Sequence, residues 1–286
     1  MLYIYLEKYL KDLGFSKSAL ICFKTYLEDR QLRVISKTPR SEPPDINLAV
    51  PQGFVLGPLL FCLCMNDIKS QFDQNTFYLL YVNDLQVYIQ VSPECVLEEI
   101  KKINMITRSV SQWVNKVSLL LNPDKTKVIY FGSGIFVDRL NKLQLPGVDM
   151  GNGIILPFVQ EVKNLGVILD CRLSWESHIT SIKKMANRVL YTLRFIRGCT
   201  SEMLRKRLIQ ALVTPNMDYC IVILLDGNAS LKTRIQRLSN TGLCYVFGIC
   251  RDTHISHFKK KLNWLTTDAR RTHFFLRHKP RDTARG

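Results

Sequence analysis

Residues 79–90 read LLYVNDLQVYIQ and place an asparagine and an aspartate between two segments rich in aromatic and branched side chains. The flanking segments, residues 77–81 and 85–91, favour strands. Asn83-Asp84 between them favours a tight turn, because both residues tolerate left-handed backbone. The sequence therefore predicts a β-hairpin with a carboxamide and a carboxylate at its tip. Taken alone, such a pair is more often a turn former than a functional site.

The composition of the 286-residue chain is that of a globular protein with a basic surface. Apolar residues make up 47% and charged residues 22%, and the length suffices for one large domain or two small ones. Lys and Arg number 40 against 24 Asp and Glu, so the net charge of +16 favours a polyanionic partner. Nucleic acid and an anionic membrane surface both satisfy this charge, and composition does not choose between them.

The N-terminal and apolar segments do not predict export or a membrane anchor. The opening MLYIYLEKYLKDLG carries charges where the apolar core of a secretory signal would continue. Nine irregularly spaced cysteines do not predict a disulfide framework, so nucleus or cytoplasm is expected. The uncharged run 46–66 is long enough to span a bilayer, but its two prolines and two glycines predict a loop that enters a buried helix near residue 59.

Hydrophobic periodicity predicts helices on both sides of the hairpin. A helical pattern covers residues 1–35, with a break at Gly14 and a restart behind Ser16. Residues 133–160 are expected to be irregular. The remaining predictions are a turn at 122–124, short strands at 127–132 and within 162–170, and helices at about 94–117, 175–197, 201–213 and 231–246. A mixed α/β part is therefore expected up to residue 172, followed by a basic helical part.

Two sequence blocks, AVPQGFVLGPLLFCLCMNDI at 49–68 and LLYVNDLQVYI at 79–89, stand in a characteristic order. They resemble the Pro-Gln-Gly-Ser-x-Leu-Gly-Pro loop and helix and the Tyr-Ala-Asp-Asp hairpin of the reverse transcriptases of non-long-terminal-repeat (non-LTR) retrotransposons, jockey-type elements in particular. The blocks LNPDKTKVIYFGS, VKNLGVILD, LSWESHI, TPNMDYC and LNWLTTDARR follow in the family's order. The resemblance covers the chain from about residue 6 to 271, and the ordered blocks make it far more specific than the hairpin alone.

The resemblance implies an α+β right-hand polymerase fold. It implies palm and fingers remnants in residues 1–172, and a helical thumb with a C-terminal extension in residues 173–286. The implied activity is RNA-directed DNA synthesis on an RNA template and a DNA primer. Two Mg²⁺ ions would stabilise the attacking and leaving oxygens, and such hard cations bind anionic oxygen ligands.

This chain departs from the family at the implied metal site. Asn83 stands where the family has the first hairpin aspartate, the principal metal ligand, so Asp84 remains as a weak Mg²⁺ ligand at best. The family's early-strand carboxylate, in a block ending Phe-Asp, is expected before residue 1. Glu7 follows LYIYL, but the helical spacing continues through Leu10 and Leu13. The endonuclease usually found ahead of the polymerase is also expected to be missing. We therefore predict a truncated, degenerate domain that does not catalyse synthesis.

The resemblance also implies roles in binding template and nucleotide. Gln52 and Gly53 fall in the loop that positions template and incoming nucleotide, with Phe54 in place of the usual serine. Lys125 matches a lysine near the nucleotide phosphates, although a solvated turn lysine explains it equally well. Either explanation is compatible with a turn at this position.

Two further predictions concern the two hairpins. Leu165-Gly166 match the primer-grip-like hairpin, where glycine would permit close approach of a backbone. Tyr81 and Leu85 are expected to lie in the core whatever the function.

The basic helical part is the implied site of contact with nucleic acid. Residues 183–207 hold eight Lys and Arg against one acid, and residues 251–286 hold ten against three. A charge run is often only a solvated face, but a thumb would grip a phosphate backbone here. The assigned backbone contacts are Lys183, Lys184, Arg188, Arg205, Lys206 and Arg207. Two other hypotheses remain open: a non-catalytic nucleic-acid-binding protein, and an unselected relic that does not fold stably.

Overall fold

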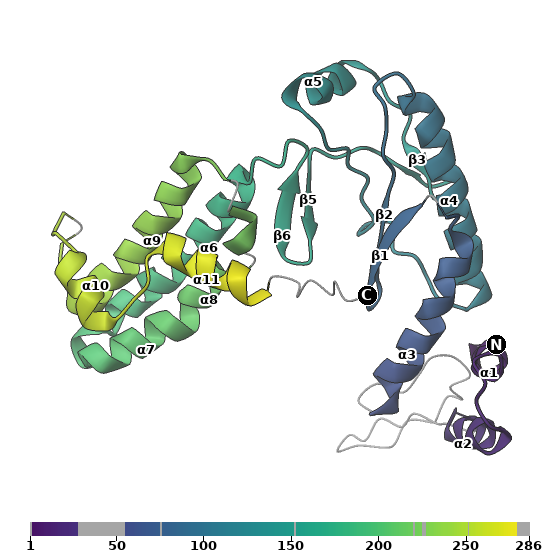
Figure 1. Cartoon of the computed structure of the whole chain (residues 1–286), viewed down its shortest axis with the longest axis horizontal. Coiled ribbons are helices and arrows are strands. Elements are labelled where there is room, and N and C mark those ends of the chain that lie inside the picture. Colours follow the sequence, from purple (N-terminus) through teal and green to yellow (C-terminus); the bar gives the residue numbers. More distant parts are fainter. Residues whose placement is uncertain are drawn as a thin grey trace, which may run out of the picture. The chain divides into compact units, whose positions relative to one another are not determined.

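The computed structural model describes residues 2–27, 55–74, 76–151, 153–219, 221–224, 227–250 and 252–278. Within these ranges helices predominate, and the strands form three separate two-stranded sheets (Figure 1). Contacts divide the chain into a first unit, Met1–Val128 with Leu143–Phe158, and a second unit, Ile129–Lys142 with Val159–Gly286. The mixture of helices and small sheets is the expected α+β content. The palm, fingers and thumb assignment and the boundary at residue 172 stay predictions.

The first unit is built from helices around one hairpin. Gly14 ends the first helix with a φ of 83°, which favours glycine, and the Ser16 hydroxyl accepts a hydrogen bond from the Ala19 N–H at 3.3 Å. Both predicted boundaries are thereby confirmed. The elements are α1 (Leu2–Asp12), α2 (Lys17–Leu27), α3 (Leu56–Asn66), the 3₁₀ helix η1 (Asp67–Gln71), β1 (Phe77–Tyr81), β2 (Asp84–Tyr88), α4 (Val96–Lys116), β3 (Val148–Asp149) and β4 (Ile155–Leu156).

The core of the first unit lies between α3, η1 and α4. Leu60, Ile68 and Val117 are almost fully buried there. Trp113 joins them, and its indole N–H donates to the Asp67 carboxylate at 3.1 Å, so a buried aromatic keeps its polar group satisfied. The described part of the uncharged run 46–66 forms the 11-residue α3, and no helix in the described ranges combines the length and apolar content needed to cross a membrane.

The structure corrects the predicted strand at 127–132. Only Val128 pairs there, in an isolated parallel bridge with Phe158. A strand requires a partner backbone along its length, and the following residues find different partners: the Gly132 N–H donates to the Cys171 carbonyl at 3.1 Å. Residues 133–160, expected to be irregular, contain α5 (Gly134–Lys142) as well as β3 and β4. The predicted strand within 162–170 is a hairpin, β5 (Glu161–Asn164) and β6 (Val167–Asp170).

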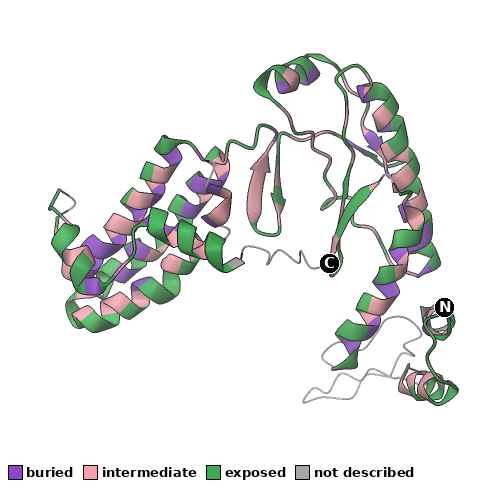
Figure 2. Ribbon diagram, viewed as in Figure 1, coloured by how far each residue is buried: buried purple, intermediate pink, exposed green. Residues whose placement is uncertain are grey.

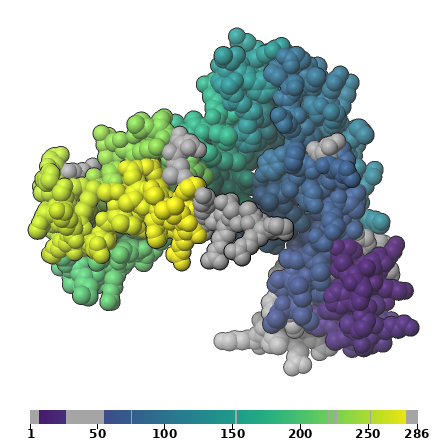
Figure 3. Space-filling model, in the orientation of Figure 1, coloured from purple at the N-terminus to yellow at the C-terminus, as the bar shows by residue number. Residues whose placement is uncertain are grey.

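Beyond β6 the second unit is helical, as predicted. One face of α6 is buried against α9, and these buried positions line up along the helices in Figure 2. Ser201 and Asn228 cap α7 and α9, accepting from the N–H groups of Leu204 at 3.3 Å and Leu231 at 2.9 Å. The elements are α6 (Glu176–Phe195), η2 (Arg197–Cys199), α7 (Glu202–Leu212), α8 (Thr214–Asp218), η3 (Ile221–Leu224), α9 (Ala229–Phe247), α10 (Ser256–Leu262) and α11 (Thr267–His278). In Figure 3 the side chains of the green and yellow helices form a continuous body.

The Asp170 carboxylate organises the turn between β6 and α6. It accepts four hydrogen bonds of 3.1 Å, from the N–H groups of Arg172, Ser174 and Trp175 and from the Ser174 hydroxyl. Leu173 and Trp175 have φ values of 50° and 65°, which large side chains rarely adopt. Burial by itself would raise the pKa of Asp170, but these hydrogen bonds outweigh it and hold the pKa below its usual value.

We predict that Asp170→Ala lowers the free energy of unfolding by about 2 kcal/mol at pH 7, because several N–H groups lose their acceptor. The folded-state pKa of Asp170 is lowered, so its contribution is complete above the unfolded pKa of about 4 and is lost as the pH falls through the folded value. Urea denaturation at neutral and acidic pH measures this difference. Asp138→Asn is the control, since its ion pair with Arg172 is exposed on both sides and should contribute about 0–1 kcal/mol. Equal effects of the two substitutions would contradict the prediction.

Candidate functional site

The β1–β2 hairpin places Asn83 and Asp84 at one end of a small antiparallel sheet. Tyr81 pairs with Asp84, so the hairpin turn occupies residues 81–84 and its two-residue loop is Val82-Asn83. The predicted turn is confirmed, and the second strand begins at Asp84, one residue before the predicted segment 85–91. Val82 carries a φ of 55°, an uncommon conformation for a β-branched residue and one that is often found at functional sites.

The two faces of this hairpin have different surroundings. Leu80 and Leu85 pack against the core of the first unit, which agrees with the expectation for Leu85. Tyr81 is 60% exposed, so the expectation that it lies in the core was wrong. Alternate residues of a strand point to opposite faces, and Tyr81 shares its exposed face with Phe77 and Leu79. Both Asn83 and Asp84 are exposed.

The donor groups at this tip can be compared with what divalent metal ions require. A two-ion polymerase site uses several carboxylates, because hard cations take negatively charged oxygen ligands. Of the pair only Asp84 is anionic, while Asn83 offers a neutral amide oxygen. In the part of the chain that the structure describes, no three His, Cys, Asp or Glu side chains form a group that could hold a metal. The donor set at this tip does not fit a pair of Mg²⁺ ions.

Lys125 lies in the turn that the sequence predicts. Its N–H donates to the Asn122 side-chain oxygen at 3.1 Å, and the Thr126 N–H donates to the Asn122 carbonyl at 3.0 Å. The Lys125 side chain is exposed, and its contact with nucleotide phosphates stays a prediction. Gln52 and Gly53, expected in the template loop, lie outside the described residues.

Leu165 and Gly166 form the turn of the β5–β6 hairpin. Both have positive φ, 44° and 86°, as the type I′ turn of a hairpin requires. The Tyr219 hydroxyl donates to the Leu165 carbonyl, and a side-chain carbon on Gly166 would lie 3.1 Å from Cε1 of the Tyr219 ring. The glycine therefore does permit a close approach, here by Tyr219 of the same chain. The primer-grip role stays a prediction.

The six cations assigned to nucleic-acid contact are not equivalent. Lys183, Lys184 and Arg188 are exposed along α6. On α7 Arg207 is exposed, whereas Arg205 and Lys206 are half-buried. The Nε atom of Arg205 is itself buried and has no hydrogen-bond partner among the residues that the structure describes. The α6 cations are therefore better placed to reach a phosphate backbone than those at 205 and 206.

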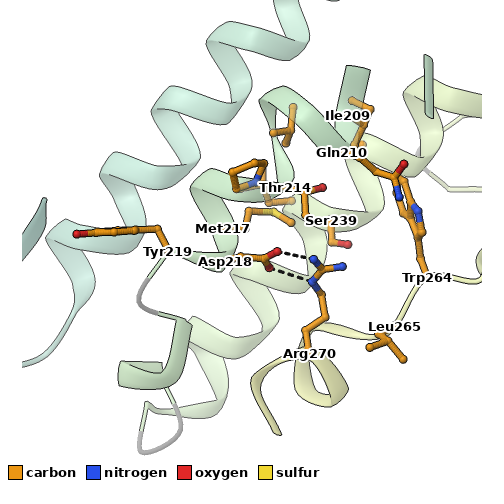
Figure 4. Close-up of a pocket in the computed structure, with 14 residues that line it drawn as sticks. Ile209, Gln210, Thr214, Met217, Asp218, Tyr219, Ser239, Trp264, Leu265 and Arg270 are labelled. Carbon is orange, nitrogen blue, oxygen red and sulfur yellow. Dashed lines mark hydrogen bonds and ion pairs between the residues drawn. The ribbon is translucent and has the colours of Figure 1, made fainter. Parts of the chain in front are cut away.

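The structure reveals an ion pair beside a cavity in the second unit that sequence reasoning missed. The cavity, of about 520 Å³, lies among α7, α8, α9 and the start of α11, and Trp264 and Met217 line it (Figure 4). The Arg270 Nε donates to Asp218 Oδ1 at 2.9 Å, and its Nη2 donates to Oδ2. Asp218 belongs to the TPNMDYC block and Arg270 to LNWLTTDARR, so two blocks of the family pattern meet here. Opposite charges 52 positions apart give no signal in a single sequence.

We predict that Asp218→Asn lowers the free energy of unfolding by about 2 kcal/mol. The half-buried Arg270 guanidinium donates to both carboxylate oxygens, and an amide offers only one oxygen acceptor. Arg270→Lys should cost a similar amount, since an ammonium cannot make both hydrogen bonds in parallel. Lys261→Gln provides the control, because its pair with Glu202 is largely exposed. Thermal and urea denaturation of the three variants test this. The pair is unimportant if Asp218→Asn unfolds like the control.

Comparison with known proteins identifies the class. The family model "Reverse transcriptase (RNA-dependent DNA polymerase)" matches residues 6–169, more than half of the chain, so the chain belongs to the reverse transcriptase family. Its reverse transcriptase domain is of the jockey type found in non-LTR retrotransposons.

Three curated relatives illustrate the similarity. The RNA-directed DNA polymerase from mobile element jockey of Drosophila funebris is 25% identical over 209 residues, 70% of this chain and 22% of that protein. The probable RNA-directed DNA polymerases from transposon BS and transposon X-element of Drosophila melanogaster are 27% and 26% identical, over 77% and 76% of this chain. The chain spans about a quarter of the length of these relatives.

Proposed function

We propose that this chain is a reverse transcriptase domain derived from a non-LTR retrotransposon, and that it binds nucleic acid without extending a primer. The inherited activity is RNA-directed DNA synthesis, which in this family generally depends on a divalent metal ion. The main support for a loss of activity is the asparagine at position 83. Asn83 lies at the hairpin tip, where the family has its first metal-binding aspartate.

The argument for inactivity is electrostatic. Two divalent ions bring four positive charges to the site, and carboxylates neutralise the part that the nucleotide triphosphate does not. An amide oxygen at position 83 coordinates without neutralising, and Asp84 supplies one negative charge. The lost stabilisation amounts to several kcal/mol of barrier, and each 1.4 kcal/mol is about tenfold in rate.

The support for nucleic-acid binding is the distribution of charge. The net charge of +16 attracts any polyanion, and Lys183, Lys184 and Arg188 are exposed on one helix. Three exposed cations on one rigid element can follow a phosphate backbone, and each phosphate they neutralise releases counterions. The natural ligands would be an RNA template and a DNA primer, because the curated relatives are named RNA-directed DNA polymerases.

We predict that the chain will not extend a labelled primer on an RNA template with Mg²⁺ or Mn²⁺. Asn83→Asp alone should not restore extension, because it adds one carboxylate beside Asp84 and a pair of divalent ions requires more. The assay compares the wild type, Asn83→Asp and Asp84→Ala. Extension by the wild type that disappears in Asp84→Ala would show a working metal site and overturn the proposed inactivity.

We predict that the chain binds nucleic acid with little sequence preference and that its affinity falls steeply with salt. Replacing Lys183, Lys184 and Arg188 by Glu should weaken binding by at least tenfold, since attractive phosphate contacts become repulsive. Lys8→Glu with Lys11→Glu changes exposed charges in the first unit and should have a smaller effect. Filter binding over a range of salt concentrations measures both. Equal losses per charge at the two sites would mean that only the net charge attracts the ligand.

A further inference from the structure

The outer face of α6 carries a line of two cations and two aromatic residues. Lys184, Arg188, Tyr191 and Phe195 follow one another at steps of four, three and four residues, so they form one stripe of the helix, here called the α6 ridge. Tyr191 is 62% exposed and Phe195 is 73% exposed. Their rings touch edge to face, with centroids 5.2 Å apart and an interplanar angle of 87°.

Packing of the second unit does not account for these aromatic residues. The core face of α6 is a separate stripe of Ile179, Ile182, Ala186, Leu190 and Leu193, all buried. Large aromatic side chains gain free energy by burial, so two adjacent rings left in water indicate a surface that binds something. The charged residues of the ridge are both cations. The one acid of α6, Glu176, lies in the first turn and is paired with Arg234.

We propose that the α6 ridge binds single-stranded nucleic acid, with bases stacked on Tyr191 and Phe195 and phosphates held by Lys184 and Arg188. The proposal rests on the proposed binding of nucleic acid and specifies the form that this surface takes. A duplex keeps its bases stacked on each other and offers phosphates, for which cations alone would suffice. An unpaired strand can place a base face on an aromatic ring, and each such contact strengthens binding without regard to sequence.

An anionic membrane is the other polyanion that a basic helix could contact. A helix lying in a membrane interface needs a broad apolar face directed into the lipid. The broad apolar face of α6 is used in the protein core, and its outer face presents two rings among Lys183, Lys184, Arg188 and Arg194. The chemistry of the ridge therefore matches alternating bases and phosphates better than a lipid surface.

The experiment compares two labelled single strands of equal charge by fluorescence anisotropy. One is an oligothymidylate of about 16 nucleotides, and the other is an abasic strand of the same length with the same phosphates. The wild type should bind the oligothymidylate about tenfold or more tightly than the abasic strand. Tyr191→Leu with Phe195→Leu should remove this difference and leave the affinity for the abasic strand unchanged. Tyr191→Phe with Phe195→Tyr should retain it.

Two further variants separate stacking from charge. Lys184→Gln with Arg188→Gln should weaken binding to both strands and reduce the salt slope by about 1.4, since two phosphate contacts are lost at about 0.7 each. Met185→Leu is the matched control, because Met185 is 47% exposed on α6 but lies off the ridge. It should bind both strands like the wild type. All of the replaced side chains are exposed, so each variant should melt at the temperature of the wild type.

The outcomes distinguish this proposal from the proposed function. If the wild type binds neither strand nor a duplex, the proposed binding of nucleic acid fails and the ridge proposal fails with it. If it binds but the double leucine variant discriminates between the two strands like the wild type, the ridge proposal alone is overturned. The same holds if the double leucine variant binds oligothymidylate normally but no longer binds vesicles of phosphatidylserine, which would make the ridge a membrane contact.

Discussion

The second unit depends on the burial of one face of α6 against α9. Ile179, Ile182, Leu190 and Leu193 from α6 meet Leu231, Ile235, Leu238 and Val246 from α9 in one core. Burial of each such side chain contributes about 1.5–3 kcal/mol, so this contact outweighs any polar interaction in the unit. The turn that Asp170 organises supports this contact, because the turn links the end of β6 to the start of α6 and so orients the buried stripe of α6. With one face of α6 committed to the core, its cations and its two exposed rings face solvent.

The hairpin forms without a carboxylate at position 83. Asparagine and aspartate have almost the same shape, and both are tolerated in tight turns, so position 83 can change from one to the other without moving the strands. Leu80 and Leu85, the cross-strand pair next to Tyr81 and Asp84, anchor the hairpin to the core on the opposite face. In the proposed function, the asparagine lacks a negative charge that metal ions require and that the backbone does not. Loss of polymerase chemistry therefore need not entail loss of the domain.

Sequence reasoning located the elements whose signals are local. The break at Gly14, the hairpin around Asn83 and the long helices α4, α6 and α9 all follow from periodicity, capping and turn residues. These patterns act over a few positions and need no knowledge of the rest of the chain. The order of the motif blocks also identified the family, and the neutral side chain at position 83 could be read directly from the hairpin.

By itself, then, the sequence determined the family, the helices, the hairpin and the charge of the pair Asn83-Asp84. The tertiary structure alone decided features that depend on distant partners. Residues 127–132 have the composition of a strand, yet only Val128 forms a β-bridge, and Tyr81 lies exposed because no element in the described part of the chain covers its face. Asp218 and Arg270 pair across 52 positions, and Gly166 packs on Tyr219. The physical reason is common to all of them: a strand, a buried ring and an ion pair are each completed by groups that no local pattern specifies.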